Sequence, residues 1–422
     1  MIQKDPFWWK KAKIYELYVD KFAHDFKGLT AKLDYFTSLG INCLHILPHY
    51  PSPMIDDGYD VSNYRDVRPE LGNLLDMKEM INEAHKRGIR VITDLVLNHV
   101  SQDHPWFQDA RSSKDSSKRD YFLWSKTGLE FEGATNAFPD MKDSNWISNS
   151  ETEDFYFATF YPEQPDLNWN NEEVLHSMLS IMDFWIQIGV DGFRLDAAPY
   201  LIKREGTTSK GLPETHQILK KIRKHLDNAF PGTMLLAEVH MSVEESKKYF
   251  GDGDECQMVY HFPLAEELWL ALMRNDTKRV ESVIQEASEI PEGCEWATFL
   301  RNHDEISLHL LSPEDHMELI DFLDPRKEYV MKKMRKTSMR IASIFGGDQE
   351  KIIAAKKLLY SLPGAPILYY GDEIGMRNLP LQEGIIDTRK YIRGNFDWDE
   401  AEKQLKDPNS LLNSVAKIIE ER

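Results

Sequence analysis

Short apolar runs alternate with amphipathic stretches along most of this chain. Glycines mark the expected ends of several intervening helices, since Gly40, Gly88 and Gly189 each stand just before an apolar run. Glycine is favoured there because it adopts the left-handed conformation at low cost. The runs have the length and composition of buried strands, and they span residues 13–19, 42–48, 90–97, 192–197, 233–238, 257–263, 296–302 and 365–371.

Eight strands that alternate with helices predict a parallel sheet, and eight is the number that closes a (β/α)8 barrel. An open, doubly wound sheet is the alternative topology. It would place ligand contacts at a single crevice, whereas polar residues follow the apolar runs along the whole chain. We therefore expect an α/β fold built on a closed TIM barrel.

One connection departs from this alternation. Residues 98–170 are rich in Asp, Ser, Asn, Trp and Phe and show little helical period, which predicts a subdomain inserted after the third strand. An amphipathic helix is expected to resume near Glu172, and the charged segment 307–347 is expected to be helical. The expected units are a barrel over 1–99 and 171–398, an inserted B-type subdomain over 100–170, and a C-terminal helical tail over 399–422.

Composition narrows the class of protein and its partners. The 422 residues are 41% hydrophobic and carry a formal net charge of −19, which argues against nucleic acid or an anionic membrane as a partner. Cys43, Cys256 and Cys294 lack metal-site spacing and indicate reduced thiols. The start of the chain lacks a signal-peptide pattern, and no run reaches the roughly 18 apolar residues of a membrane span. We expect a soluble, cytoplasmic protein.

Three carboxylates stand at the ends of apolar runs: Asp196 in GFRLDA, Glu238 in MLLAE and Asp304 in FLRNHD. His99 ends a fourth run. Barrel enzymes build their sites at the carboxyl ends of the strands, and two carboxylates that flank a glycosidic bond can cleave it. Each acid alone has an ordinary structural explanation, but their joint occurrence predicts a catalytic site.

Local sequence suggests separate roles for two of these acids. Arg194 and Asp196 alternate on one strand, so both side chains point to the same face. We expect the guanidinium to lower the pKa of Asp196 and keep it ionised, as a nucleophile requires, although a purely structural ion pair is the alternative. Glu238 follows the apolar run MLLA, where desolvation is expected to favour the protonated form and general acid catalysis.

The chain resembles the α-amylase superfamily (glycoside hydrolase family 13), because the family's short regions occur in order. These regions read DLVLNH (94–99), QPDLN (164–168), GFRLDA (192–197), LLAEVH (235–240) and FLRNHD (299–304). The longer stretches DAAPYLIKREGT, LPETH, GDGDEC, HFPL and SLPGAPILYYGDEIGM are similar to the trehalose synthase branch. The resemblance implies a retaining glycosidase or transglucosidase that acts on an α-glucoside or malto-oligosaccharide.

The same resemblance implies roles for individual residues. Asp196 would be the nucleophile, Glu238 the acid/base and Asp304 the transition-state stabiliser. In a retaining enzyme the carboxyls of the first two are expected about 5–5.5 Å apart. The other expected substrate contacts are His99, Arg194, His303, Tyr59 as a stacking platform, and Asp56 with Arg393 as an ion pair that closes the glucose pocket.

The resemblance also implies a calcium site, which would use Asn98, Asp166, Tyr200 and Leu201. Lys203 stands where trehalose synthases carry a glutamate, so its ammonium could occupy or repel the cation. The first loop after a strand is shortened to FAHDFKGL, without the acidic loop that binds calcium in relatives. We expect that no cofactor is required, and whether structural calcium or the ammonium of Lys203 occupies this site stays open at this point.

Relatives continue into an antiparallel β-domain after the barrel, whereas this sequence stops at SLLNSVAKIIEER. That domain is expected to be absent or truncated, and a second copy of the chain or another partner is expected to cover the barrel flank. Two alternatives to a trehalose synthase activity stay open. One is a hydrolytic α-glucosidase or α-amylase acting on α-1,4 or α-1,6 linkages, and the other is a noncatalytic sugar-binding barrel.

Overall fold

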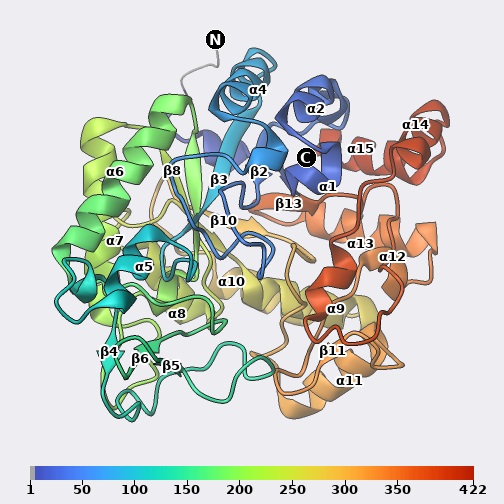
Figure 1. The fold of residues 1–422 in the computed structure, drawn as a ribbon. Coiled ribbons are helices and arrows are strands. Elements are labelled where there is room, and N and C mark those ends of the chain that lie inside the picture. The colour runs from blue at the N-terminus through green and yellow to red at the C-terminus, as the bar shows by residue number, and fades with distance from the viewer. Residues whose placement is uncertain (1–4) are drawn as a thin grey trace.

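A closed barrel of eight parallel strands forms the centre of the computed structural model, which describes residues 5–422 (Figure 1). The strands follow one another around the barrel in chain order, and the last pairs with the first. They are β1 (Ile14–Leu17), β2 (Cys43–Ile46), β3 (Arg90–Val96), β7 (Gly192–Asp196), β8 (Met234–Ala237), β9 (Met258–Tyr260), β10 (Glu295–Thr298) and β13 (Ala365–Tyr369). The predicted TIM barrel is confirmed, and the open sheet is excluded. Residues 1–4, which the expected barrel unit includes, lie outside the described residues.

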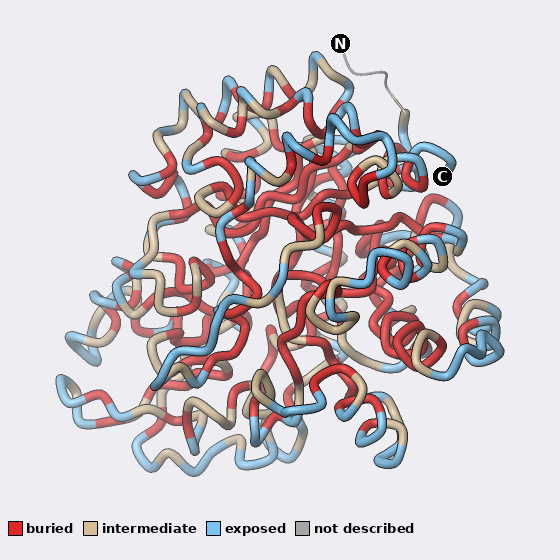
Figure 2. Tube along the Cα trace, turned by 90° about the vertical axis from the view of Figure 1, so that its right-hand side faces the viewer, coloured by how far each residue is buried: buried red, intermediate tan, exposed pale blue. Residues whose placement is uncertain are grey.

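Helices surround the barrel, and the buried residues fill the space between the two layers (Figure 2). The apolar face of α6 is buried, and Gly189 ends this helix at a φ of 127°, as its place before β7 predicts. The helices are α1 (Val19–Ala23), α2 (Phe26–Ala31), α3 (Leu33–Ser38), α4 (Leu74–Lys86), α6 (Glu172–Ile188), α7 (Pro213–Ala229), α8 (Val243–Lys247), α9 (Phe262–Arg274), α10 (Lys278–Glu286), α11 (Pro313–Leu323), α12 (Ile341–Ile344), α13 (Gln349–Ser361), α14 (Trp398–Lys406) and α15 (Leu411–Glu421). Short 3-10 turns are η1 (Trp8–Lys11), η2 (Pro69–Leu71), η4 (Ala198–Tyr200), η5 (Lys248–Phe250) and η6 (Thr388–Ile392).

Several strands are shorter than the apolar runs that predicted them. The run 257–263 contains both the end of β9 and the start of α9, because the side chain of His261 accepts the N–H of Leu264 and caps the helix. In the run 296–302 the strand β10 ends at Thr298, and the later residues lie beyond it. The remaining residues of these runs form the loops that carry polar side chains beyond the barrel.

A small subdomain follows β3, as the sequence predicts. It contains α5 (Pro105–Ser112), η3 (Arg119–Tyr121) and a three-stranded antiparallel sheet of β4 (Trp124–Ser125), β6 (Asp154–Phe157) and β5 (Trp146–Asn149). Figure 1 shows this sheet at the lower side of the barrel, away from the two chain termini. The expected boundaries of the three units stay a prediction.

The segment 307–347 is only partly helical, which corrects the expectation from its charge. Between α11 and α12 it forms a hairpin of β11 (Val330–Met331) and β12 (Lys336–Thr337). Its turn holds Arg335 at a left-handed φ of 54°, a conformation that does not continue a helix. The tip of the hairpin docks on the inserted subdomain, where the carboxylate of Asp140 accepts the backbone N–H groups of Lys333 and Met334 at 3.0 and 2.9 Å.

Within residues 5–422, none of the helices combines the length and apolar character needed to cross a membrane. The three cysteines are free and buried. At the end of the chain α15 packs on α13, and the ammonium of Lys13 donates to the carbonyl of Ile419 at 2.6 Å.

Candidate active site

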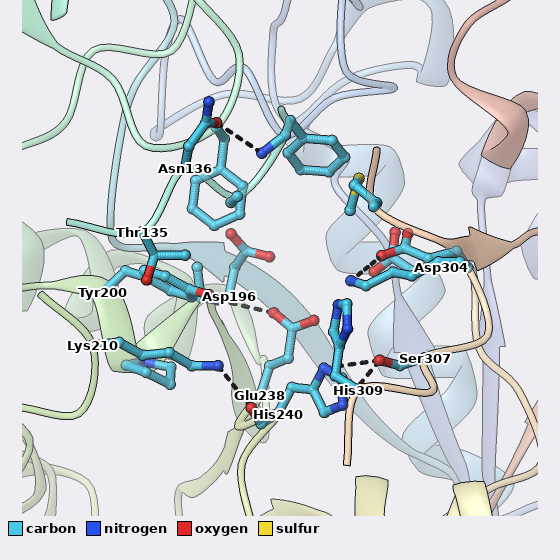
Figure 3. A pocket seen from close by; sticks show the side chains of 18 of the residues that line it. Thr135, Asn136, Asp196, Tyr200, Lys210, Glu238, His240, Asp304, Ser307 and His309 are labelled. Atoms are coloured by element: carbon cyan, nitrogen blue, oxygen red, sulfur yellow. Dashed lines mark hydrogen bonds and ion pairs between the residues drawn. The ribbon is translucent and has the colours of Figure 1, made fainter. Parts of the chain in front are cut away.

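Asp196, Glu238 and Asp304 line one pocket at the carboxyl ends of the barrel strands (Figure 3). Asp196 is the last residue of β7, Glu238 follows β8, and Asp304 lies on the loop after β10. The pocket has a volume of about 390 Å³, a size typical of small-molecule sites. The three acids that the sequence singles out therefore share one cavity.

One guanidinium links the first two acids. Nη1 of Arg194 donates to Oδ1 of Asp196 at 2.5 Å, and Nη2 lies 3.1 Å from Oε1 of Glu238. The backbone N–H of Ala197, which has a left-handed φ of 49°, donates to Oε2 of Glu238 at 3.0 Å. Both acids are thereby held beside the same cation, although they follow different strands. Their expected separation of about 5–5.5 Å stays a prediction.

The charge on Asp196 differs from the expectation. Burial raises the pKa of Asp196 well above its usual range; Arg194 opposes this effect, and the carboxylate of Glu238 reinforces it. The expected lowering was wrong chiefly because the carboxyl is buried, and Arg194 cannot offset this cost since its Nη1 also contacts Asp94 at 2.6 Å.

Asp304 has the opposite electrostatic environment. One of its oxygens lies 3.0 Å from Nε2 of His303, and the other lies 2.9 Å from Arg393 and 3.2 Å from Arg389. Burial alone would raise the pKa of Asp304, but the three cations hold it well below its usual range. Asp304 is therefore ionised at neutral pH.

A buried network supports this arrangement from below. Nδ1 and the backbone N–H of His303 both contact Oε1 of Glu16, at 2.9 and 2.8 Å. Burial lowers the pKa of His303, yet Asp304 and Glu16 together raise it to about 9. Glu16 also contacts His45 at 3.2 Å, and His45 contacts Asp94 at 2.9 Å. The network thus joins β1, β2 and β3 to the acids in the pocket.

Two further expected residues, Tyr59 and His99, face the same cavity. The ring of Tyr59 lies nearly parallel to that of His303, with the centroids 5.5 Å apart. His99 is buried, and its Nε2 has no hydrogen-bond partner among the described residues. Burial lowers the pKa of His99 to about 4. A neutral imidazole with an unpaired nitrogen can bind a sugar hydroxyl.

The sequence analysis expected Asp56 to pair with Arg393, but Asp56 pairs with Arg389. Oδ1 of Asp56 lies 2.6 Å from Nη2 of Arg389. Arg393 instead contacts Asp57 at 2.6 Å and Asp304 at 2.9 Å. Arg389 lies within η6 and lines the pocket, whereas Arg393 directly follows η6 and is not among the lining residues. Their closeness in sequence did not show which of the two pairs with Asp56.

The sequence reasoning missed the residues that surround this pair. Arg389 also contacts Oδ2 of Asp387 at 2.8 Å, and the hydroxyl of Tyr161 donates to the same oxygen at 2.8 Å. Nε2 of Gln164 donates to Asp56 at 2.9 Å. Gln164 belongs to the family region QPDLN, so the sequence contained a signal that could have identified it as a residue of this site. Asp387 precedes Arg389 by two positions in a charged loop, where no pattern marked it.

Comparison with known proteins identifies the family of this chain. The family model described as alpha amylase, catalytic domain, matches residues 17–322. The chain belongs to the α-amylase family. It is 42% identical over 405 residues to a trehalose synthase from Thermus thermophilus, which covers 94% of this chain and 41% of that protein. It is 43% identical over 385 residues to a trehalose synthase/amylase from Mycobacterium tuberculosis, which covers 88% and 63%.

A solved structure shows the same relationship. The crystal structure of the α-amylase from H. orenii matches with a TM-score of 0.76 and 28% identity, over 98% of this chain and 82% of that one. The chain spans less than two thirds of the length of the trehalose synthases from Thermus thermophilus and Mycobacterium tuberculosis.

The residues expected at the family's calcium site enclose an ammonium instead. Nζ of Lys203 lies 2.7 Å from Oδ1 of Asn98 and 2.7 Å from Oδ2 of Asp166, and it contacts the carbonyl oxygen of Tyr200. Leu201 makes no hydrogen bond to it among residues 5–422. Calcium needs six to eight oxygens around an open centre, so this set does not fit calcium. The lysine supplies the positive charge there.

Proposed function

We propose that the protein is a retaining enzyme for α-glucosides, most like trehalose synthase, which interconverts maltose and trehalose through a covalent glucosyl–Asp196 intermediate. The observation that carries this proposal is the pair of Asp196 and Glu238 on one guanidinium, beside an ionised Asp304. Identities of 42% and 43% to trehalose synthases over most of the chain support the substrate class.

In the first half-reaction, the nonreducing glucose of maltose lies between Tyr59, His99 and the ion pair of Asp56 with Arg389. A carboxylate oxygen of Asp196 bonds to C1 while the glycosidic C1–O bond breaks, and Glu238 gives its proton to the leaving oxygen. The negative charge of Asp304 would stabilise the positive anomeric centre.

The second half-reaction releases the sugar from Asp196. The anomeric hydroxyl of the freed glucose bonds to C1, the ester bond breaks with its electrons returning to Asp196, and the hydroxyl proton passes to Glu238. A water molecule in the same position would give hydrolysis. The partition between the two products depends on how well the pocket excludes water.

Incubation of the purified protein with maltose tests the specific activity. Carbon-13 NMR or anion-exchange chromatography separates trehalose from free glucose. We expect trehalose to exceed glucose throughout the reaction. Glucose without trehalose would instead assign the chain to the hydrolytic α-glucosidase or α-amylase alternative.

The noncatalytic alternative requires a different test. Asp196→Asn should lower the turnover of 4-nitrophenyl α-glucoside by at least about 10³-fold, because the nucleophile is lost while the pocket is kept. Asp143→Asn is the matched control, since that side chain is 96% exposed. An unchanged rate in Asp196→Asn would support a sugar-binding relative with a site elsewhere.

We also propose a cytoplasmic location and association with a second copy or a partner chain. The three free cysteines support the first point. Size-exclusion chromatography with light scattering tests the second.

A further inference from the structure

One wall of the active-site pocket carries positive charge that the proposed reaction does not use. Figure 3 shows part of this wall on the lower side of Glu238, away from Thr135 and Asn136 at the top of the view. We call it the basic wall, and it consists of Lys210, Lys333, Lys336, His240 and His309.

The basic wall lies beside the acid that faces the leaving group. His240 is two residues beyond Glu238, and Nζ of Lys210 donates to the carbonyl oxygen of His240 at 2.7 Å. The ring of His240 lies 4.7 Å from Phe262 and 5.4 Å from His309. The ion pair around Arg389, by contrast, contacts Asp304. In the reaction proposed above, a group across the scissile bond from the glucose therefore meets the basic wall.

Lys210 is a cation that Glu238 stabilises through its charge but without a direct ion pair. Among residues 5–422 no carboxylate lies within ion-pair distance of its ammonium, which donates a hydrogen bond to the neutral carbonyl of His240. Burial and the neighbouring Lys336 lower the pKa of Lys210 to about 8, so the group is still mostly protonated at neutral pH. A partly buried charge without a partner is costly, and such a cost is typical of a binding site.

The surrounding acids do not cancel the charge of the wall. Lys336 pairs with Glu305 at 2.7 Å, and Lys333 reaches only the exposed Asp143 at 3.0 Å. Glu266 contacts His240, but burial raises the pKa of Glu266 to about 8, which keeps it largely neutral. Burial lowers the pKa of His240 well below its usual range and that of His309 to about 4, so the positive charge of the wall comes from its lysines and above all from Lys210. The neutral hydroxyls of a sugar need only uncharged donors and acceptors.

We propose that the basic wall binds an aglycone that carries an anionic group, a phosphate or a carboxylate, in preference to a neutral sugar. The proposal rests on the proposed function, because it names the acceptor class of the glucosyl–Asp196 intermediate. An acceptor hydroxyl bonds to C1 as the ester bond breaks, the electrons return to Asp196, and the proton passes to Glu238. The anionic group binds Lys210 and Lys336 and stays unchanged through the step.

Acceptor competition tests this preference directly. The donor is 4-nitrophenyl α-glucoside, and the acceptors are offered below saturation in matched pairs, glucose against glucose 6-phosphate and glycerol against glycerate. Mass spectrometry counts transfer products for each nitrophenol released. We expect at least one charged acceptor to receive about tenfold more glucose than its neutral match, since charge-assisted hydrogen bonds are the stronger ones. Equal or lower transfer to both charged acceptors would overturn the proposal.

Variants connect the preference to the wall. Lys210→Met should reduce the ratio of charged to neutral transfer by about tenfold, because the substitution removes one charge-assisted contact. Lys220→Met is the matched control, because Lys220 is an exposed lysine on α7 that pairs with Asp254 outside the pocket. A ratio in Lys210→Met equal to that of the wild type would also overturn the proposal. The phosphate and carboxylate pairs identify which anion the wall prefers.

Calorimetric binding of the same acceptors needs no turnover and separates the two proposals. Absence of nitrophenol release would refute the proposed function, while tighter binding of a charged acceptor to the wild type than to Lys210→Met would still support the basic wall. Equal affinity for charged and neutral acceptors would refute the wall even in an active enzyme.

Discussion

Replacement of Lys203 by methionine tests whether the chain's own ammonium holds the region between the barrel and the inserted subdomain. The substitution keeps an unbranched stem of similar length and removes the charge. Oδ2 of Asp166, Oδ1 of Asn98 and the carbonyl of Tyr200 then lose their shared donor. All of this happens in a site where the lysine side chain is 1% exposed.

The magnitude follows from what the substitution leaves behind. Breaking a buried ion pair by removing one partner costs about 3–5 kcal/mol. Asp166 keeps two contacts to Thr159, one of them the backbone N–H at 2.9 Å, so we expect the lower end of that range. With an unfolding entropy of about 2.1 cal/mol/K per residue, a loss of about 3 kcal/mol lowers the Tm of a 422-residue chain by about 3 °C.

Differential scanning calorimetry measures this change, with and without EDTA or calcium. The Tm of the wild type should not respond to either addition, because the ammonium takes the cation's place. Lys203→Met combined with Asp166→Asn should recover part of the loss, since both buried charges are then removed. Lys220→Met, an exposed lysine, is the control and should stay within about 0.5 kcal/mol of the wild type.

Two results would refute the reasoning. A Tm of Lys203→Met within about 1 °C of the wild type would show that the pair with Asp166 adds no net stability. A drop in the Tm of the wild type on addition of EDTA would show that a metal, and not the lysine, holds these oxygens.

Three further predictions concern the pocket and its surroundings. Arg389→Met should lower kcat/KM for 4-nitrophenyl α-glucoside by on the order of 10²-fold, because a buried carboxylate loses its charged partner; steady-state kinetics against Lys220→Met check it. Asp140→Ala should raise the ratio of glucose to trehalose formed from maltose, since two N–H groups of the hairpin lose their acceptor and the pocket admits water. The neighbouring Asp143→Ala should leave that ratio unchanged. Burial raises the pKa of Glu266 from 4.5 to about 8, so its stabilising contribution is full below pH 4.5 and is lost as the pH rises through 8. Glu266→Gln should therefore remove a decline of up to about 1.4 kcal/mol per pH unit, measured by urea unfolding at pH 5 and pH 8.

The barrel could be predicted from sequence because its strands are buried on both faces. Such strands appear as continuous apolar runs, and glycines such as Gly189 separate them from the preceding helices. The strand ends were less accessible. The run 257–263 is apolar throughout, yet it divides between β9 and α9, because the capping contact of His261 is decided by geometry that hydrophobicity does not record.

The buried ionic network below the pocket was the main omission from the site. Glu16 and Asp94 each interrupt an apolar strand run, which was a visible signal. Their partners depend on the register of the barrel, where Asp94 of β3 stands opposite Arg194 of β7. That register brings a third carboxylate to the same guanidinium, and its charge adds to the effect of burial, which raises the pKa of Asp196.

Arg389 shows why the two ends of the site act together. Its Nη2 lies 2.6 Å from Asp56, while its Nη1 lies 3.2 Å from Asp304. One guanidinium thus joins Asp56 to Asp304, the acid proposed to stabilise the transition state. Arg393, which the sequence analysis paired with Asp56, contacts the same oxygen of Asp304 at 2.9 Å. A sugar that displaces or tightens the contact at Asp56 therefore changes the charge environment of Asp304, so binding in this pocket and stabilisation of the anomeric centre depend on the same side chain.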